Sequence, residues 1–312
     1  MTHPDNSTSA QALRIETALV TSGRDTAAQK GFVNPPVVRG STVLNPTADD
    51  LQPHRGEFQY SRHGTPTTKA LREALQALEG PQCAGVSLTP SGVSAITTAL
   101  LAVLKTGDHV LVCDNAYRPT RLFCDGMLKR YGIETSYFDP LIGDGIAAHF
   151  KPNTRAVLVE APGSQTFEMP DIPAIAKAAH TREILVLDDN TWATPLFHRS
   201  LEQGVDISIQ AATKYIGGHS DIMFGTISAN EKAWPLVADG VRQLGVCAGP
   251  DDVFLALRGL RTLAVRLAHH QRAGLEMARW LATRPEVTDV LHPGLETSPG
   301  HAIWRRDFTG AS

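Results

Sequence analysis

One short stretch of the chain combines residue types that could act together in chemistry. Lys214 is preceded by the hydroxyl of Thr213 and followed by a Gly-rich turn, residues 217–221, that ends in a carboxylate. A lysine is most often a solvated surface residue, so Lys214 on its own does not indicate a function. Its neighbours make a chemical role worth testing against the rest of the sequence.

Two further stretches carry polar groups where predicted strands end. Asp188-Asp189-Asn190 follows one strand, and a carboxylate there could face a ligand nitrogen or simply cap a turn. Residues 89–93, Thr-Pro-Ser-Gly-Val, follow another strand and open a helix. Free amides at such a helix start can bind a phosphate, although a Gly-containing turn is more often ordinary loop structure.

Taken together, these residue types match the needs of one cofactor, pyridoxal phosphate. This cofactor requires a lysine amine for covalent attachment, a carboxylate that keeps its pyridine nitrogen protonated, and donors for its phosphate. Lys214, the Asp188-Asp189 pair and the turn at residues 89–93 supply one candidate for each requirement. We therefore predict a pyridoxal phosphate site at the edge of a sheet.

The elements that must position these residues alternate between short apolar runs and helical patterns. This alternation predicts an α/β fold with a mostly parallel sheet and helices on both faces. One helix is expected from Thr67, with apolar residues at helical spacing, up to the stop signal Gly80-Pro81. The other predicted helices cover 91–104, 118–131 and 171–179, and the predicted strands cover 86–88, 109–113, 133–137, 156–160, 184–188 and 205–209.

The flanking segments differ from this central pattern. Residues 1–62 are rich in Pro, Thr, Asn and Arg, which predicts an extended N-terminal arm. Beyond Asp251 a long helical pattern runs to Pro285, and residues 287–291 could form a strand. The expected division is an arm at 1–62, a pyridoxal phosphate domain at 63–258 and the start of a C-terminal α+β domain at 259–312.

The composition excludes several kinds of partner. The chain has 312 residues with 29 Lys and Arg against 32 Asp and Glu, a net charge of −3, so we expect neither nucleic acid nor membrane binding. Residues 1–11 lack a signal-peptide pattern, and the four cysteines show no C-x-x-C spacing, which predicts reduced thiols in a cytoplasmic protein. The 12 histidines form no His-Glu-x-x-His pattern, so no metal site is predicted.

Several motifs resemble the Cys/Met-metabolism family of pyridoxal phosphate enzymes, from about residue 14 to the last residue. The most specific is the lysine motif at 208–221, and the bacterial β-lyases are the members resembled most. The resemblance implies fold type I, a pyridoxal phosphate-dependent transferase-like fold, and a homotetramer built as a dimer of dimers. The other motifs are Asp189-Asn-Thr-Trp192, Tyr60-Ser-Arg-His-Gly64, Gly259-Leu-Arg-Thr-Leu263 and His301-Ala-Ile-Trp-Arg-Arg-Asp-Phe-Thr-Gly310.

The resemblance also implies roles for single residues. Lys214 is the lysine that carries the cofactor and acts as the catalytic base, and Asp189 is the partner of the pyridine nitrogen. Tyr117 stacks on the ring and assists catalysis, while Asp188 is left with a structural role. The phosphate is bound by the helix start Ser91, Gly92 and Val93 and by the hydroxyl of Thr213, and Tyr60 and Arg62 reach the phosphate of a neighbouring subunit.

The activity implied by the resemblance is a carbon–sulfur lyase reaction on a small amino acid. We expect β-elimination of L-cystathionine to homocysteine, pyruvate and ammonia, a step of methionine biosynthesis. The γ-synthases and γ-lyases of the family, methionine γ-lyase among them, remain alternatives because the motifs do not separate them.

This sequence departs from the family pattern in two places. Many relatives carry Ser where Ala211 stands. Relatives also continue beyond the position of Ser312 with a part that supplies an arginine for the substrate α-carboxylate, so we expect a C-terminally truncated chain. A non-catalytic fragment that binds the cofactor weakly is therefore the competing hypothesis.

Overall fold

A computed structural model describes residues 13–52 and 57–312. Residues 1–11, for which no signal peptide is predicted, and Pro53 of the arm lie outside these ranges. Seven strands form one sheet in the order β1-β7-β6-β5-β4-β2-β3. The strands are β1 Gly85–Thr89, β2 His109–Cys113, β3 Glu134–Phe138, β4 Thr154–Glu160, β5 Leu185–Asp189, β6 Ile207–Gln210 and β7 Gly225–Ala229.

The sheet is mostly parallel, as predicted. Strands β3, β2, β4, β5 and β6 pair in parallel, whereas β7 runs antiparallel to both β6 and β1. Parallel pairing brings the carboxyl ends of β4, β5 and β6 to one edge. The α/β class expected from the alternating pattern is thereby confirmed.

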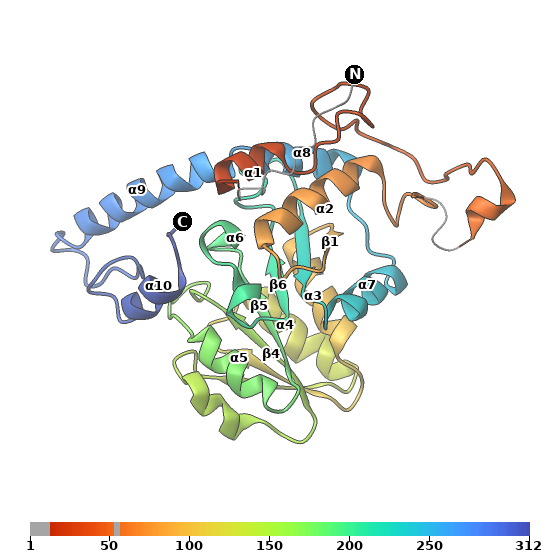
Figure 1. The fold of residues 1–312 in the computed structure, drawn as a ribbon. Coiled ribbons are helices and arrows are strands. Elements are labelled where there is room, and N and C mark those ends of the chain that lie inside the picture. Colours follow the sequence, from red (N-terminus) through yellow and green to blue (C-terminus); the bar gives the residue numbers. More distant parts are fainter. Residues whose placement is uncertain (1–12, 53–56) are drawn as a thin grey trace, which may run out of the picture.

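Helices cover both faces of the sheet (Figure 1). Apolar side chains of α2, α5 and α8 belong to the buried cluster on one face, and those of α3 and α7 belong to the cluster on the other. The bounds are α1 Ile15–Thr21, α2 Pro66–Glu79, α3 Gly92–Val103, α4 Arg118–Phe123, α5 Ile172–His180, α6 Thr194–Phe197, α7 Trp234–Gln243, α8 Pro250–Leu260, α9 Leu263–Leu281 and α10 His301–Asp307.

Helix α2 shows how local sequence signals set these elements. Thr65 caps its first turn by accepting a hydrogen bond from Thr68 N at 3.2 Å, and Pro66 occupies the first position, where a missing N–H costs nothing. The helix ends at Gly80, whose φ of +96° suits glycine. Leu71 and Leu75 are fully buried on the face that packs against β1 and α8.

Three expectations about elements are wrong or incomplete. The N-terminal arm is not wholly extended, because Ile15–Thr21 forms α1 and docks on α2 and α9. The helical pattern after Asp251 is two helices, broken at Arg261 and Thr262, and residues 287–291 form no strand. The predicted helix at 118–131 is α4 followed by a π-helical turn at Cys124–Leu128.

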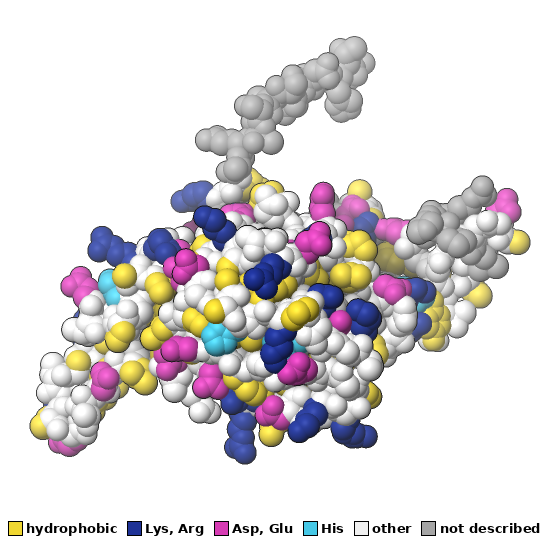
Figure 2. Space-filling model, turned by 90° about the horizontal axis from the view of Figure 1, so that it is seen from below, with side chains coloured by type: hydrophobic (Ala, Val, Ile, Leu, Met, Phe, Trp, Pro, Cys, Tyr) yellow, Lys and Arg dark blue, Asp and Glu magenta, His cyan; other side chains and the backbone are white. Residues whose placement is uncertain are grey.

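The arm projects from the body of the molecule beside α7 (Figure 1). It exposes large apolar side chains: 91% of the surface of Leu44 and 73% of the surface of Phe32 are accessible to solvent. On the face shown in Figure 2, acidic and basic side chains are interspersed. Of the helices that the structure describes, none has the length and apolar character that crossing a bilayer requires.

A buried acid on α2 predicts a measurable pH dependence of stability. Glu79 is 1% exposed, and burial raises its pKa from 4.5 to about 7, although the Ser208 hydroxyl donates to its Oε1 at 3.1 Å. Between pH 4.5 and 7 the folded chain therefore binds a proton that the unfolded chain has released. The free energy of unfolding should fall by about 3 kcal/mol as the pH rises through this window.

Replacing Glu79 with Gln removes this proton while keeping an acceptor for Ser208. We expect Glu79→Gln to flatten the decline of stability between pH 4.5 and 7, measured by urea denaturation at a series of pH values. Glu73→Gln is the matched control, because Glu73 lies exposed on the same helix and pairs with Lys69 at 3.9 Å. An equal decline in the Glu79→Gln variant and the parent chain would contradict the prediction.

Candidate active site

Lys214 lies in the loop that follows β6, at the carboxyl end of that strand. Two backbone hydrogen bonds hold this loop: Lys214 N donates to Ala211 O at 3.0 Å, and Gly218 N donates to Lys214 O at 2.7 Å. Gly218 has a φ of +78°, a conformation that favours glycine. The amine of Lys214 is 5.7 Å from the centroid of the Tyr117 ring, so the fold brings these two predicted residues together.

Asp189 is the last residue of β5, the strand beside β6, and is 7% exposed. Its Oδ1 accepts hydrogen bonds from Thr191 N at 3.2 Å and from Thr191 Oγ1 at 2.5 Å. None of the described residues donates to Oδ2. Burial raises the pKa of Asp189, and the Thr191 hydrogen bonds and the charge of Lys214 oppose this rise. A cationic N–H group at Oδ2 would restore the ionised form.

Glu160, the last residue of β4, is a third carboxyl at this edge. Its Oε2 accepts a hydrogen bond from Tyr117 N at 2.7 Å, which fixes the start of α4 and with it the Tyr117 side chain. Burial and the neighbouring Asp189 raise the pKa of Glu160 well above 4.5, and Lys214 opposes this shift. The site therefore joins the ends of three adjacent strands, β4, β5 and β6.

The predicted phosphate-binding turn is the N-terminus of α3. Ser91 caps the helix, with its Oγ accepting a hydrogen bond from Ser94 N at 3.0 Å. The amides of Gly92 and Val93 donate to no residue in the described part of the chain, as the first turn of a helix leaves them. A Cβ on Gly92 would lie 2.6 Å from the Cβ of Ala211, so glycine permits close contact between α3 and the lysine loop.

The three other predicted site residues are Thr213, Tyr60 and Arg62. The hydroxyl of Thr213 accepts from Phe224 N at 2.8 Å and donates to Phe224 O at 3.1 Å, bracing the loop after Lys214. Tyr60 and Arg62 belong to the arm, and Arg62 Nη1 donates to Arg242 O on α7 at 3.0 Å. No described contact joins either arm residue to Lys214 or Asp189 of the same chain. Their predicted role toward a neighbouring subunit stays a prediction.

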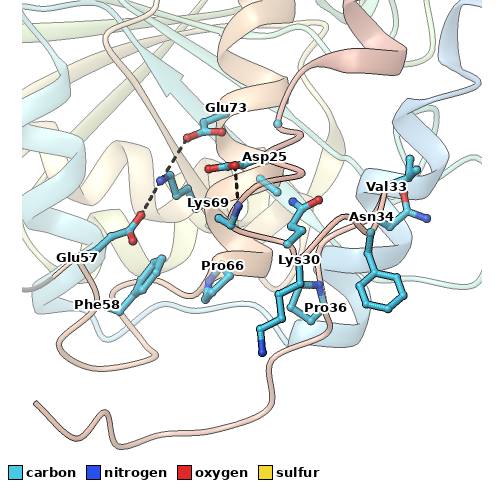
Figure 3. Close-up of a pocket in the computed structure, with 15 residues that line it drawn as sticks. Asp25, Lys30, Val33, Asn34, Pro36, Glu57, Phe58, Pro66, Lys69 and Glu73 are labelled. Atoms are coloured by element: carbon cyan, nitrogen blue, oxygen red, sulfur yellow. Dashed lines mark hydrogen bonds and ion pairs between the residues drawn. The ribbon is translucent and has the colours of Figure 1, made fainter. Parts of the chain in front are cut away.

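A separate cavity lies away from these residues. It has a volume of about 800 Å³ between the arm and α2, and Figure 3 shows Lys69 at its centre with Glu57 and Glu73. Lys69 Nζ is 2.5 Å from Glu57 Oε1 and 3.9 Å from Glu73 Oε1, so its charge is balanced inside the cavity wall. Lys214, Asp189 and Tyr117 do not line this cavity, so cavity size alone would misplace the site.

Comparison with known proteins decides the family. A sequence model described as "Cys/Met metabolism PLP-dependent enzyme" matches residues 16–312, which is most of the chain. The chain belongs to this family. Its cofactor class is therefore pyridoxal phosphate, as the residue set at the strand ends predicts.

Individual relatives of this PLP-dependent family agree in sequence and structure. A protein of Rhizobium johnstonii is 51% identical over 298 residues, covering 96% of this chain and 75% of its own length. Cystathionine β-lyase of Haemophilus influenzae is 42% identical over 305 residues, covering 96% and 76%. The crystal structure of cystathionine γ-lyase from Lactobacillus plantarum, complexed with L-serine, matches with a TM-score of 0.90 at 28% identity, covering 96% and 77%.

The residues present fit the cofactor of this PLP-dependent family. Asp189 offers an oxygen without a donor, inside a buried position where a carboxylate otherwise lacks sufficient stabilisation. Gly92 and Val93 offer unpaired amides at the N-terminus of a 12-residue helix, a favourable place for a phosphate. The side chains of Lys214 and Tyr117 are exposed, and the amine lies 5.7 Å from the centroid of the ring.

Two residues of this site were not predicted from the sequence. Glu160 ends a predicted strand and precedes Ala161-Pro162-Gly163, a position like that of Asp189, and this likeness could have identified it. Thr191 links Asp189 to the lysine loop, because its hydroxyl also accepts a hydrogen bond from Ala211 N at 2.8 Å. That bridge joins residues 20 positions apart, and no local pattern in the sequence indicates it.

The glycine of the Gly259-Leu-Arg motif has a packing role behind the lysine loop. A Cβ at Gly259 on α8 would lie 2.3 Å from the carbonyl oxygens of Ile216 and Gly217. Backbone atoms cannot rotate away, so Gly259→Ala must push α8 and the loop apart. We expect a loss of roughly 1–3 kcal/mol in the free energy of unfolding and weaker binding of pyridoxal phosphate.

Gly274→Ala provides the control for this prediction. Gly274 lies inside α9, and a Cβ there would meet nothing within 4 Å. Alanine should therefore raise stability by up to about 1 kcal/mol through helix propensity. Denaturation curves of both variants and fluorescence titration with pyridoxal phosphate test the pair. Equal stability of the Gly259→Ala variant and the parent chain would be evidence against the close contact.

Proposed function

We propose that this chain catalyses β-elimination of L-cystathionine to homocysteine, pyruvate and ammonia. The observation that carries the proposal is the placement of Lys214, Tyr117 and Asp189 at one sheet edge in a chain of the PLP-dependent family. The relative from Haemophilus influenzae that bears the name cystathionine β-lyase supports the choice of substrate.

Each residue of the candidate site has a separate role in the proposed reaction. When bound, pyridoxal phosphate supplies an electron sink for the charge that develops at the substrate Cα. Lys214 would hold the cofactor through its amine, and the free amine would act as the general base that takes the proton from the substrate Cα. Asp189 Oδ2 would hold the proton on the pyridine nitrogen, and the amides of Gly92 and Val93 would bind the phosphate. Tyr117 would orient the ring and could exchange a proton with the substrate amine.

A product assay tests this reaction against the nearest alternative. The solved γ-lyase relative makes elimination at Cγ the competing activity. With L-cystathionine as substrate, β-elimination releases homocysteine and pyruvate, whereas γ-elimination releases cysteine and 2-oxobutyrate. Formation of 2-oxobutyrate as the main keto acid would refute the proposed reaction. It would not contradict the assignment of the cofactor-binding residues.

We further propose that the active form is a homo-oligomer in the cytoplasm in which the arm completes the site of a neighbouring subunit. Tyr60 is exposed, and Arg62 donates a hydrogen bond to Arg242 O on α7. Neither residue has a described contact with Lys214 of its own chain. The projecting arm also exposes Leu44, Phe32 and Val33, an apolar surface that a second copy could cover.

Mixing two inactive variants tests this assembly. Lys214→Ala and Arg62→Ala alter different halves of a shared site, so chains mixed during refolding should form some sites with both residues intact. We expect activity in the mixture that neither variant shows alone, and a sedimentation coefficient above that of a monomer. A mixture no more active than the Arg62→Ala variant by itself would exclude a shared site.

A further inference from the structure

A second acid lies directly beside Asp189 and has no assigned function. Asp188 is 1% exposed, and neither of its carboxyl oxygens has a hydrogen-bond partner among the described residues. His198 Nε2, which is also buried and unpaired, lies 3.9 Å from Asp188 Oδ2. The hydroxyl of Ser200 faces the same carboxyl without a hydrogen bond of normal geometry. Buried polar groups without partners are rare and require an explanation.

The charges around this pair favour its uncharged state. Burial raises the pKa of Asp188 well above 3.8, and the negative charges of the nearby Asp189 and Glu79 raise it further. Burial lowers the pKa of His198 to about 4, opposed by Asp307 on α10. His198 Nδ1 is 3.3 Å from Asp307 O, so Nδ1 carries the donor hydrogen and Nε2 presents a lone pair toward Asp188. An acid facing a base in this way remains neutral as a pair.

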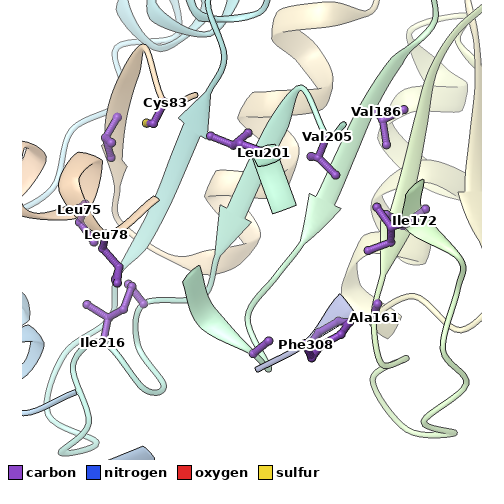
Figure 4. Close-up of a cluster of buried hydrophobic side chains, with 14 of the residues drawn as sticks. Leu75, Leu78, Cys83, Ala161, Ile172, Val186, Leu201, Val205, Ile216 and Phe308 are labelled. Carbon is purple, nitrogen blue, oxygen red and sulfur yellow. The ribbon is translucent and has the colours of Figure 1, made fainter. Parts of the chain in front are cut away.

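The same histidine links the C-terminal residues to the end of β5. Its ring stacks on Phe308 with centroids 4.1 Å apart and planes at 11°. Its backbone carbonyl accepts a hydrogen bond from Asn190 Nδ2 at 2.6 Å. Phe308 and Ala161, the residue that follows β4, belong to the same buried cluster (Figure 4). Two sets of contacts therefore hold His198. Residues 307–308 contact its ring, and Asn190, the neighbour of Asp189, donates to its backbone carbonyl.

We propose that Asp188 and His198 are positioning residues that form one buried, uncharged pair, hold residues 307–308 against the end of β5, and thereby set the orientation of Asp189. The part concerning Asp189 rests on the proposed function, because it assumes a cofactor nitrogen at Oδ2. The uncharged state of the pair depends only on the two side chains.

Nuclear magnetic resonance of the unmodified chain tests the uncharged state of the pair without cofactor. With ¹⁵N-labelled histidine, the His198 ring signals are assigned by their loss in the His198→Phe variant. We expect these signals to stay constant from about pH 5.5 to 8.5, because a buried neutral pair does not titrate there. A ring that titrates near 6.5, like a solvated histidine, would overturn the proposal.

A double-variant cycle tests the positioning role. Asp188→Leu and His198→Phe each leave the other partner buried and unpaired, whereas the double variant removes both polar groups. We expect each single change to weaken binding of pyridoxal phosphate about tenfold, and the double variant to bind within about threefold of the parent chain. Single effects that multiply in the double variant would show that the two residues act independently and would overturn the pair.

A spectroscopic signature separates positioning from general destabilisation. With pyridoxal phosphate labelled by ¹⁵N in the ring, Asp188→Leu should shift the ring-nitrogen signal toward the unprotonated form. Asp188→Asn can still donate to His198 Nε2 and should keep the parent signal. An unchanged signal in the Leu variant, with only lowered stability, would reduce Asp188 to a structural role and refute the inference.

The chain provides a matched control in a second His–Asp pair. His180 Nε2 lies 2.9 Å from Asp206 Oδ2, where Asp206 also accepts from Val186 N near the opposite end of β5. His180→Phe should leave the ring-nitrogen signal unchanged, and a shift equal to that of Asp188→Leu would contradict a local role. Failure to trap the cofactor on Lys214 would refute the proposed function. A His198 ring that titrates near 6.5 would refute only this inference.

Discussion

Replacing Lys214 with Ala should abolish both covalent attachment of the cofactor and turnover. The amine is the one group of the described site that can bond to an aldehyde, and it also serves as the base for the Cα proton. Losing an anchor and a general base together should lower turnover by at least about 1,000-fold. Borohydride reduction followed by mass spectrometry should show the adduct on the peptide containing residue 214 in the parent chain only.

Lys232→Ala is the matched control for this change. Lys232 is exposed just before α7 and takes no part in the site. It should leave the adduct and the rate at the values of the parent chain. Turnover that survives Lys214→Ala, or an adduct found on another lysine, would refute the assignment of Lys214.

Replacing Asp189 with Asn should separate attachment from reactivity. The Lys214 amine remains, so borohydride should still trap the cofactor on residue 214. An amide carries no negative charge, so it cannot keep the pyridine nitrogen protonated, and the nitrogen's pKa should fall by roughly 2–3 units. Since each unit is a factor of ten in the protonated fraction, we expect turnover to fall roughly 100- to 1,000-fold.

Asp139→Asn serves as the comparison, because Asp139 also follows a strand, β3, and its Oδ1 caps a turn by accepting from Leu141 N at 2.8 Å. Its rate should match that of the parent chain. A normal rate in the Asp189→Asn variant would assign the nitrogen's partner to another group, and Glu160 would be the first candidate, because its carboxyl interacts with both Asp189 and Lys214 at this edge.

The arrangement of the site has a simple electrostatic reason. Three carboxyls, Glu160, Asp188 and Asp189, lie at the ends of two adjacent strands, and burial raises the pKa of each. Of the three, Asp189 accepts the most hydrogen bonds, two from Thr191, and the nearby Lys214 charge also opposes the rise in its pKa. It is therefore the carboxyl best suited to stay ionised beside a cationic ring.

The sequence by itself determined the α/β class and the cofactor class, and it predicted that Lys214 and Asp189 lie at one edge of the sheet. Strands such as β2 and β5 are buried along their whole length, and residues 110–113 and 185–187 within them are uninterrupted apolar runs. Asp189 ends β5 and Lys214 lies in the loop after β6, and parallel strands end at the same edge. Short-range patterns suffice for these features because each depends on neighbours along the chain.

The sequence patterns did not predict strand β7 or the break between α8 and α9. Strand β7, Gly225–Ala229, consists mostly of small residues, Gly-Thr-Ile-Ser-Ala, with little of the apolar pattern that marks a strand. The break between α8 and α9 at Arg261-Thr262 has neither glycine nor proline, so the helical period continues through it. In both places tertiary packing, rather than local propensity, sets the structure.

Only the tertiary structure decided which polar groups meet. The hydrogen bond from Tyr117 N to Glu160 joins residues 43 positions apart, and the stacking of His198 on Phe308 joins residues still further apart in the chain. Such contacts depend on sheet order and on the register between β4, β5 and β6, which place distant side chains within a few ångströms. A one-residue shift in register would turn Asp189 to the opposite face and exchange its position with Asp188.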